Sequence, residues 1–236
     1  MRITIVGQGN VACNLLHAFE KNGVRAEMVS SKGGLGDLSE ADVFVYAVRD
    51  EALEQVVAQV HAPRALHLHT SGTMPLSVFG EDKPHAGVLY FFQSFSKAHL
   101  IEDFTTIPVF IEGRNIDDIS AIYTLVQTLT PRIYEANQYD RERLHLAGVF
   151  ANNFTNEMYA IAADILRGTS IPFQALLPLI DRTAEKIHSL SPREAQTGPA
   201  LRGDENVMQH HLSLLHTDDL RTLYRLVSKL IQETDK

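Results

Sequence analysis

The sequence lacks several features that mark specialised classes of protein. Cys13 is the only cysteine, so an internal disulfide is impossible. No apolar run approaches the roughly 20 residues that a membrane-spanning helix needs. Lysine and arginine number 21 against 29 aspartates and glutamates, and this acidic balance argues against a general nucleic-acid binder. The N-terminus enters a strand pattern at once, without a signal peptide, so we expect a cytoplasmic location and no membrane partner.

Short apolar runs alternate with helical patterns in the first half of the chain. The runs are continuously apolar, which is typical of parallel strands covered on both faces. The predicted strands are residues 3–6, 26–30, 43–48, 65–69, 88–92 and 109–112. The predicted helices between them are residues 11–21, 51–59 and 117–130. This rhythm indicates an α/β fold, a Rossmann-like domain with a parallel sheet, in which 43–48 is the fourth block if a short third element precedes it.

The pattern changes near residue 132, and no strand is predicted from residue 138 on. Helical periodicity covers residues 138–167, 172–190, 204–215 and 218–233. We therefore predict two domains, a Rossmann-like domain over residues 1–132 and an all-α C-terminal domain over residues 133–236. The helical half is too small to bury all its apolar faces alone, so we expect a homodimer formed through it.

The stretch "GQGNVA" fits the pattern G-x-G-x-x-A and lies between a predicted strand and a predicted helix. In a dinucleotide site the first glycine permits a tight turn and the second lets backbone N–H groups approach the pyrophosphate. The small third residue lets the helix pack closely. The helix N-terminus adds unpaired donors and a partial positive charge. The residues assigned to the pyrophosphate are Gly7, Gln8, Gly9, Asn10, Val11 and Ala12. The alternative is a glycine turn kept only for packing.

The tip of the second strand bears on the choice of dinucleotide. In NAD sites an Asp or Glu about 20 residues further on accepts hydrogen bonds from the ribose 2′-hydroxyl. Here the strand ends in Ser30, Ser31 and Lys32, whose hydroxyls and ammonium suit a 2′-phosphate. We therefore predict NADP rather than NAD. A shifted strand end would bring Glu27 nearer, and an ordinary loop lysine is the alternative for Lys32.

Two later strand ends extend the predicted site. Ligands in such sheets bind beyond the carboxyl ends of the strands. The residues expected to border the nicotinamide half of the cofactor are Ala47, Val48, His69, Thr70, Ser71 and Gly72. The last four form the stretch "HTSG". Its residue types are also typical of a turn, so a purely structural role is the alternative.

Polar side chains of the helical half supply candidates for the substrate side. His145, Asn152 and Asn156 share one helix face at about 100° per residue, and a histidine can donate or accept a proton near neutral pH. Arg202, in a polar loop, would clamp a substrate carboxylate. We expect His145, Asn152 and Arg202 to face the substrate. The alternative for the helix face is that its side chains form hydrogen bonds with neighbouring helices or solvent. The alternative for Arg202 is a structural ion pair. Asp204 is expected to cap the next helix.

No histidine or cysteine spacing suits a metal site, so we expect no catalytic metal. The motifs "GQGNVA", "HTSG", "FFQSFS", "ANNF" and "QTGPALRGD" resemble those of a group of Rossmann-like proteins whose helical C-terminal half is classed as a domain of unknown function. That group is related to the pyrroline-5-carboxylate reductases and the deazaflavin-linked NADP oxidoreductases. The resemblance covers nearly the whole chain. It implies an NADP-binding domain, a helical dimerisation domain and a site between them.

One departure from the wider relatives bears on the chemistry. The β-hydroxyacid dehydrogenases carry a lysine four residues before an asparagine of the long helix, whereas here Gly148 precedes Asn152. Imine reductases need no such lysine, because their substrate is already electrophilic. We therefore hypothesise an NADP-dependent oxidoreductase that transfers a hydride to or from a small anionic metabolite of imine or carbonyl type, with imine chemistry favoured over alcohol dehydrogenation. The alternatives are a non-catalytic NADP(H)-binding sensor or scaffold, and a site for another nucleotide such as S-adenosylmethionine.

Overall fold

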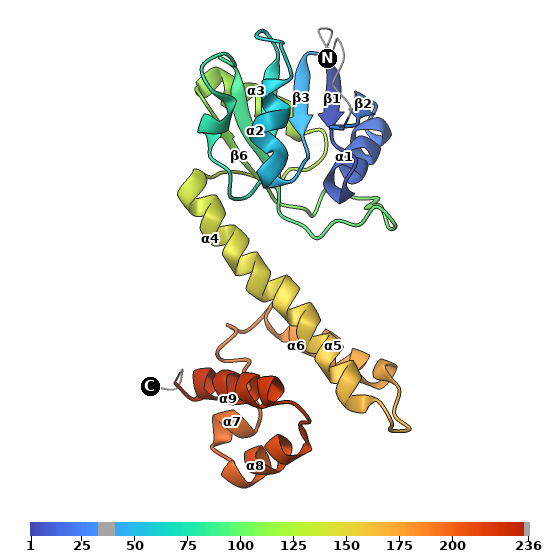
Figure 1. The fold of residues 1–236 in the computed structure, drawn as a ribbon, viewed down its shortest axis with the longest axis vertical. Coiled ribbons are helices and arrows are strands. Elements are labelled where there is room, and N and C mark those ends of the chain that lie inside the picture. Colours follow the sequence, from blue (N-terminus) through green and yellow to red (C-terminus); the bar gives the residue numbers. More distant parts are fainter. Residues whose placement is uncertain (33–40, 234–236) are drawn as a thin grey trace. The chain divides into compact units, whose positions relative to one another are not determined.

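A computed structural model describes residues 1–32 and 41–233 (Figure 1). The chain forms two compact units, Met1–Phe154 and Thr155–Lys236. The domain boundary that the sequence predicts after residue 132 stays a prediction, and a short third element before residue 43 would fall among residues outside those described. Within the described ranges, no helix combines the length and the apolar character that crossing a membrane requires. The cytoplasmic location stays a prediction.

One sheet organises the first unit and confirms the Rossmann-like α/β class. Its strands are β1 (Arg2–Val6), β2 (Arg25–Val29), β3 (Val43–Tyr46), β4 (Leu66–His69), β5 (Ala86–Phe91), β6 (Val109–Gly113) and β7 (Ile133–Glu135). They are ordered β2-β1-β3-β4-β5-β6-β7. The first five are parallel, β6 runs antiparallel to β5, and β7 runs parallel to β6. The chain therefore changes direction across the sheet at β1, and a ligand site is expected beyond the carboxyl ends of β1 and β3.

Helices cover both faces of this sheet. Alternate strand residues such as Ile3 and Ile5 pack with α1 (Asn10–Lys21) and α3 (Ile116–Val126). Strand residues that point to the opposite face of the sheet, such as Phe44 and Tyr46 of β3, pack with α2 (Asp50–Ala58) and the short helix η1 (Leu76–Phe79). The sheet is buried on both sides, which accounts for the continuously apolar strands.

The strand β7 differs from the sequence prediction, which ended the strands at residue 112. Its three residues are half-buried or exposed, so they carry no apolar signal. The strand exists because Ile133 pairs in register with Val109 of the preceding strand β6.

A long helical stretch follows, which the sequence predicted as one helix over residues 138–167. It consists of α4 (Gln138–Gly148), a π-helical turn η2 (Val149–Phe154) and α5 (Thr155–Leu166). Gly168 ends it with φ of 82°, in the left-handed region that favours glycine.

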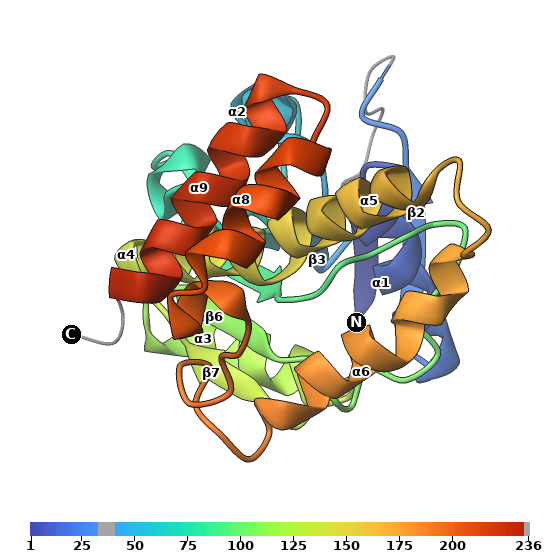
Figure 2. The same ribbon diagram turned by 90° about the horizontal axis from the view of Figure 1, so that it is seen from below.

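The second unit contains only helices among its described residues. After α5 they are η3 (Phe173–Leu176), α6 (Leu177–Lys186), α7 (Pro199–Arg202), α8 (Glu205–Leu214) and α9 (Asp218–Glu233). Helices α8 and α9 lie side by side in Figure 2, and His211 Nδ1 is 2.9 Å from the Tyr224 hydroxyl across them. Asp204 caps α8 through the Val207 N–H, as the sequence predicted. The short helix α7 lies within the stretch that was predicted to be a loop.

Candidate functional site

The glycine turn joins β1 to α1 and packs directly against the end of β3. Gly7 has φ of 130°, and a Cβ built on it would lie 2.3 Å from the Ala47 carbonyl oxygen. Its N–H donates to the Val29 carbonyl of β2 at 2.9 Å, and the Ala47 N–H donates to the Val6 carbonyl at the same distance. Gly7 is therefore a structural requirement, because no other residue fits this backbone or this space.

Gly9 is different, because no residue that the structure describes requires a glycine there. Its φ is −84°, an extended conformation that any residue adopts. A Cβ built on Gly9 would have no protein atom within 4 Å among the described residues. The packing alternative accounts for Gly7 but leaves Gly9 unexplained. Open space over a backbone at the start of a helix is what a bound pyrophosphate needs.

The first turn of α1 is free of competing negative charge. Its cap is Gly9, which has no side chain to bond the first N–H groups, and its first turn contains no acidic residue. By contrast, Asn115 caps α3, whose first turn carries Asp117 and Asp118. The positive end of the α1 dipole therefore remains available to an anion.

Two asparagines of α1 hold a later segment beside this turn. Asn10 Oδ1 accepts from the Lys97 N–H at 3.1 Å. The buried Asn14 donates to the Ser96 carbonyl at 3.0 Å and accepts from the Ile101 N–H at 2.9 Å. The segment after β5 is thereby fixed against the N-terminal half of α1, so "FFQSFS" and "GQGNVA" belong to one region. Sequence reasoning missed Asn14.

The end of β2 lies one residue before the end of the predicted strand. Thr4 pairs in register with Glu27, and the Thr4 hydroxyl donates to the Glu27 carboxylate at 3.0 Å. The strand ends at Val29, two residues beyond Glu27. Ser30 follows, with its hydroxyl accepting from the Lys32 N–H at 3.1 Å. The carboxylate that would favour NAD is therefore engaged within the sheet, and hydroxyls and an ammonium occupy the tip.

The turn after β4 uses most of its side chains internally. The Ser71 hydroxyl accepts from the N–H groups of Thr73 and Met74 at 3.1 and 3.0 Å. His69 Nδ1 accepts from the Ser71 N–H at 3.2 Å. Burial, with a smaller contribution from the Arg141 charge, lowers the pKa of His69 to about 3, so this histidine is neutral at ordinary pH. These contacts fit the turn alternative, and cofactor binding by His69 and Ser71 stays a prediction.

A cavity of about 250 Å³ lies beside this turn, where the helix α4 meets the end of β5. Its walls include the aromatic rings of Tyr90 and Phe92 and the imidazole of His145. Amide and hydroxyl groups complete it. They come from Gln93, Ser94, Asn152 and Asn153. The structure therefore brings His145 and Asn152 together, as the helix spacing predicted.

Two glycines make room for the two rings. A Cβ built on Gly72 would lie 2.8 Å from Tyr90 Cζ, and one built on Gly148 would lie 2.7 Å from Phe92 Cε2. The position that carries a lysine in β-hydroxyacid dehydrogenases is thus filled here by the Phe92 ring. The contact between Gly72 and Tyr90 also joins the turn after β4 to the cavity. The carboxyl ends of β1, β3, β4 and β5 consequently form one continuous edge.

Tyr90 and His145 contact each other in the wall of the cavity. The Tyr90 hydroxyl is 3.2 Å from His145 Nδ1. Burial raises the pKa of Tyr90 to about 12, whereas His145 lies at the surface of α4. Sequence reasoning missed Tyr90, because a tyrosine inside an apolar strand is expected to be a core residue.

The π-helical turn explains why two adjacent asparagines reach the cavity. A π-helix has wider turns than an α-helix and is often found at functional sites. Here it covers Val149–Phe154, and both Asn152 and Asn153 line the cavity. Asn156 belongs to the second unit and is not among the lining residues. The predicted stripe of three residues therefore assumed a regular helix that the chain does not form.

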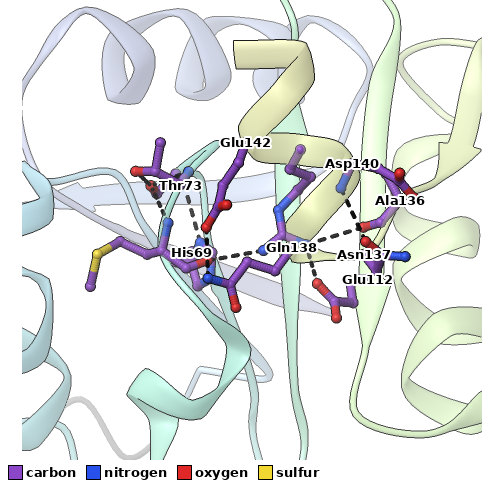
Figure 3. Close-up of polar contacts among 11 residues, drawn as sticks. His69, Thr73, Glu112, Ala136, Asn137, Gln138, Asp140 and Glu142 are labelled. Carbon is purple, nitrogen blue, oxygen red and sulfur yellow. Dashed lines mark hydrogen bonds and ion pairs between the residues drawn. The ribbon is translucent and has the colours of Figure 1, made fainter. Parts of the chain in front are cut away.

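Arg141 anchors α4 to the sheet, one turn before His145. Its side chain is fully buried, and its guanidinium pairs with Glu112 of β6. It also donates to the carbonyls of Ala136 and Met74 at 3.1 and 2.9 Å. In Figure 3, Glu112 and Ala136 lie on the right of the view and His69 and Thr73 on the left, with Gln138 of α4 between them. Sequence patterns do not indicate this burial, because a lone arginine on a polar helix is expected to be exposed.

Arg202 ends α7 in the second unit. Its guanidinium forms no hydrogen bond or ion pair with any residue that the structure describes, so the structural ion pair considered from the sequence is not observed. In the same described ranges, no group of three or more histidine, cysteine or acidic side chains is placed to hold a metal.

Comparisons with known proteins agree with this architecture. The family model "Domain of unknown function (DUF2520)" matches residues 107–231. A Bacteroides fragilis protein, provisionally assigned as an NADP oxidoreductase, is 38% identical over 98% of each chain, with a TM-score of 0.87. No curated protein matches the sequence.

Two further solved structures share the fold alone. An imine reductase from Myxococcus stipitatus in complex with NADP⁺ is 13% identical over 99% of this chain and 92% of its own, with a TM-score of 0.62. The pyrroline carboxylate reductase of Plasmodium falciparum with NADP bound is 10% identical over 98% of each chain, also with a TM-score of 0.62. The expected resemblance to NADP oxidoreductases and to pyrroline carboxylate reductase is thereby confirmed.

Proposed function

The chain belongs to the DUF2520 family, and we propose that it is an NADP-dependent oxidoreductase acting on a small metabolite. The observation that carries this proposal is the space over Gly9, at a helix N-terminus free of acidic side chains. A pyrophosphate explains that space, and packing does not. The 38% identity to the NADP oxidoreductase assigned in Bacteroides fragilis supports the same function.

The residues of the turn would hold the cofactor through their backbone. The N–H groups of the first turn of α1, from Asn10 to Ala12, would meet the pyrophosphate, with Gln8 and Gly9 leaving the approach open. Ala47, Val48 and Thr70 lie along the same edge. NADPH would supply a hydride to the substrate when bound. Both this placement and the roles of His145, Asn152 and Arg202 toward the substrate are proposals.

The preference for NADP over NAD gives the first test. We expect NADPH to bind at least about tenfold more tightly than NADH, because Ser30, Ser31 and Lys32 offer donors to a 2′-phosphate, while Glu27 is held by Thr4. Combining Ser31→Asp with Lys32→Glu is expected to reverse this order. Cofactor fluorescence in a titration measures both affinities, and the chain contains no tryptophan to interfere.

A matched control reverses a charge near the amino ends of the strands, away from the predicted cofactor site. Arg64 is exposed and precedes β4 at its amino end, so Arg64→Glu is expected to leave both affinities unchanged. Equal affinities for the two cofactors in the wild type would contradict the NADP assignment. Tight NADPH binding without consumption across a broad carbonyl and imine panel would favour the non-catalytic sensor instead.

We also propose a homodimer formed through the helical unit. Large apolar side chains are exposed on several of its helices, including Ile165 of α5, Leu179 of α6 and Leu226 of α9. Light scattering at micromolar concentration is expected to give twice the 26.3 kDa mass of the chain. Leu226→Glu is expected to shift the population toward monomer, and a monomeric wild type would contradict the proposal.

A further inference from the structure

Tyr90 shares the described lining of the cavity with one other titratable side chain, His145. It is the fifth residue of the six-residue strand β5 and is half-buried, while its hydroxyl contacts His145. The absence of a side chain at Gly72 leaves room for its hydroxyl end, since a Cβ there would lie 3.0 Å from Oη. The ring therefore packs against Gly72, with its hydroxyl at the cavity.

The Tyr90–His145 pair is arranged to pass a proton from solvent to the cavity. His145 is exposed on α4 and exchanges protons with water, whereas Tyr90 is the inner member. With a proton on Nδ1, His145 donates to Tyr90 Oη, and the phenolic O–H is free to donate to a ligand. Burial keeps the phenol protonated across the neutral range, because its pKa is raised to about 12.

Apart from His145, the polar groups that line the cavity are neutral. Its polar members, apart from Tyr90 and His145, are three amides and the Ser94 hydroxyl, and no carboxylate belongs to its described lining. An iminium substrate would bring a positive charge into a space without a negative partner, which costs free energy. A neutral carbonyl brings an acceptor oxygen to a set of donors and fits this lining.

We propose that Tyr90 is the catalytic acid of this site and that the substrate is a neutral carbonyl compound, an aldehyde or ketone. This inference rests on the proposed oxidoreductase function and replaces the imine preference of the sequence. The carbonyl carbon accepts the hydride that NADPH supplies, the π electron pair moves to oxygen, and this oxygen takes the proton of Tyr90 Oη to form an alcohol. Protonated His145 returns a proton from Nδ1 to the phenolate, becomes neutral, and takes a proton from water.

The Tyr90–His145 pair can be tested without any substrate. Tyr90→Phe keeps the ring and removes only the hydroxyl, and Tyr134→Phe is the matched control, because Tyr134 is exposed on β7. We expect the ¹⁵N resonance of His145 Nδ1 to move in Tyr90→Phe and to stay in place in Tyr134→Phe. An unchanged resonance in Tyr90→Phe would overturn the relay.

The acid role is tested by NADPH consumption, followed by absorbance, with two matched sets of compounds. One set contains small aldehydes and ketones, and the other contains cyclic imines of the same carbon skeletons. We expect consumption with the carbonyl set. In Tyr90→Phe, kcat is expected to fall about 100-fold or more, the range for loss of a general acid, with NADPH affinity unchanged. Tyr134→Phe should match the wild type.

His145→Gln separates the two members of the pair. Glutamine keeps a hydrogen-bond partner for Tyr90 but cannot relay a proton to it, so we expect a loss of only about tenfold in kcat. A larger loss in His145→Gln than in Tyr90→Phe would overturn the assignment of Tyr90 as the acid, and so would faster turnover of imines than of carbonyls. Absence of NADPH binding to the wild type would contradict the proposed function before any variant is compared. A wild type that binds NADPH but consumes none would overturn the inference together with the oxidoreductase role, while leaving the cofactor site intact.

Discussion

Gly7→Ala is expected to destabilise the fold by roughly 3 kcal/mol or more, through left-handed backbone strain and a clash with Ala47. Gly9→Ala, only two residues away, is expected to cost at most about 1 kcal/mol, the loss of a favourable helix cap. NADPH affinity should nevertheless fall at least about tenfold in Gly9→Ala, because the new methyl group occupies the space left for the pyrophosphate. Chemical denaturation and cofactor titration of the two variants measure these effects separately.

The different effects of the Gly7 and Gly9 substitutions on stability and NADPH affinity distinguish a nucleotide-binding turn from a turn kept for packing. A Gly9→Ala protein that is stable and binds NADPH like the wild type would return the motif to a packing role. Wild-type stability in Gly7→Ala would show that the close approach between Gly7 and Ala47 is relieved easily. The third possibility, S-adenosylmethionine at the same turn, predicts competition between that ligand and NADPH.

Arg141→Ala is expected to lower the free energy of unfolding by about 3 to 5 kcal/mol, the usual range for breaking a buried ion pair. The change removes the partner of Glu112 and the donors to the Ala136 and Met74 carbonyls, all from a fully buried side chain. The matched control is Arg143→Ala on the same helix. Arg143 is exposed, and its guanidinium lies 3.3 Å from the centre of the Tyr139 ring, so its loss should cost at most about 1 kcal/mol.

Arg141 is also expected to position the cavity. His145 follows it by one helical turn, so loosening the N-terminal half of α4 should move the imidazole away from Tyr90. In the more conservative variant Arg141→Lys, which keeps the charge but not the forked geometry, the His145 Nδ1 resonance should shift, whereas Arg143→Lys should leave it unchanged. Equal stability losses in Arg141→Ala and Arg143→Ala would contradict the anchoring role.

The sequence by itself determined the class of the fold and the order of its elements. Continuous apolar runs such as Val43–Tyr46 mark buried parallel strands, and "GQGNVA" marks the turn after β1. These signals are local, because each depends on a few neighbouring residues with a definite period or turn chemistry. The NADP preference was also local, since it depended on the residues that end β2.

The tertiary structure alone decided what these elements contact. It separated Gly7, which packing requires, from Gly9, which it does not, although the two are the same residue in one motif. It brought Tyr90 of β5 to His145 of α4, which are 55 residues apart in the chain. It buried Arg141, which a helical pattern places at the surface. Burial and contact depend on residues distant in sequence, so neither a motif nor a period contains this information.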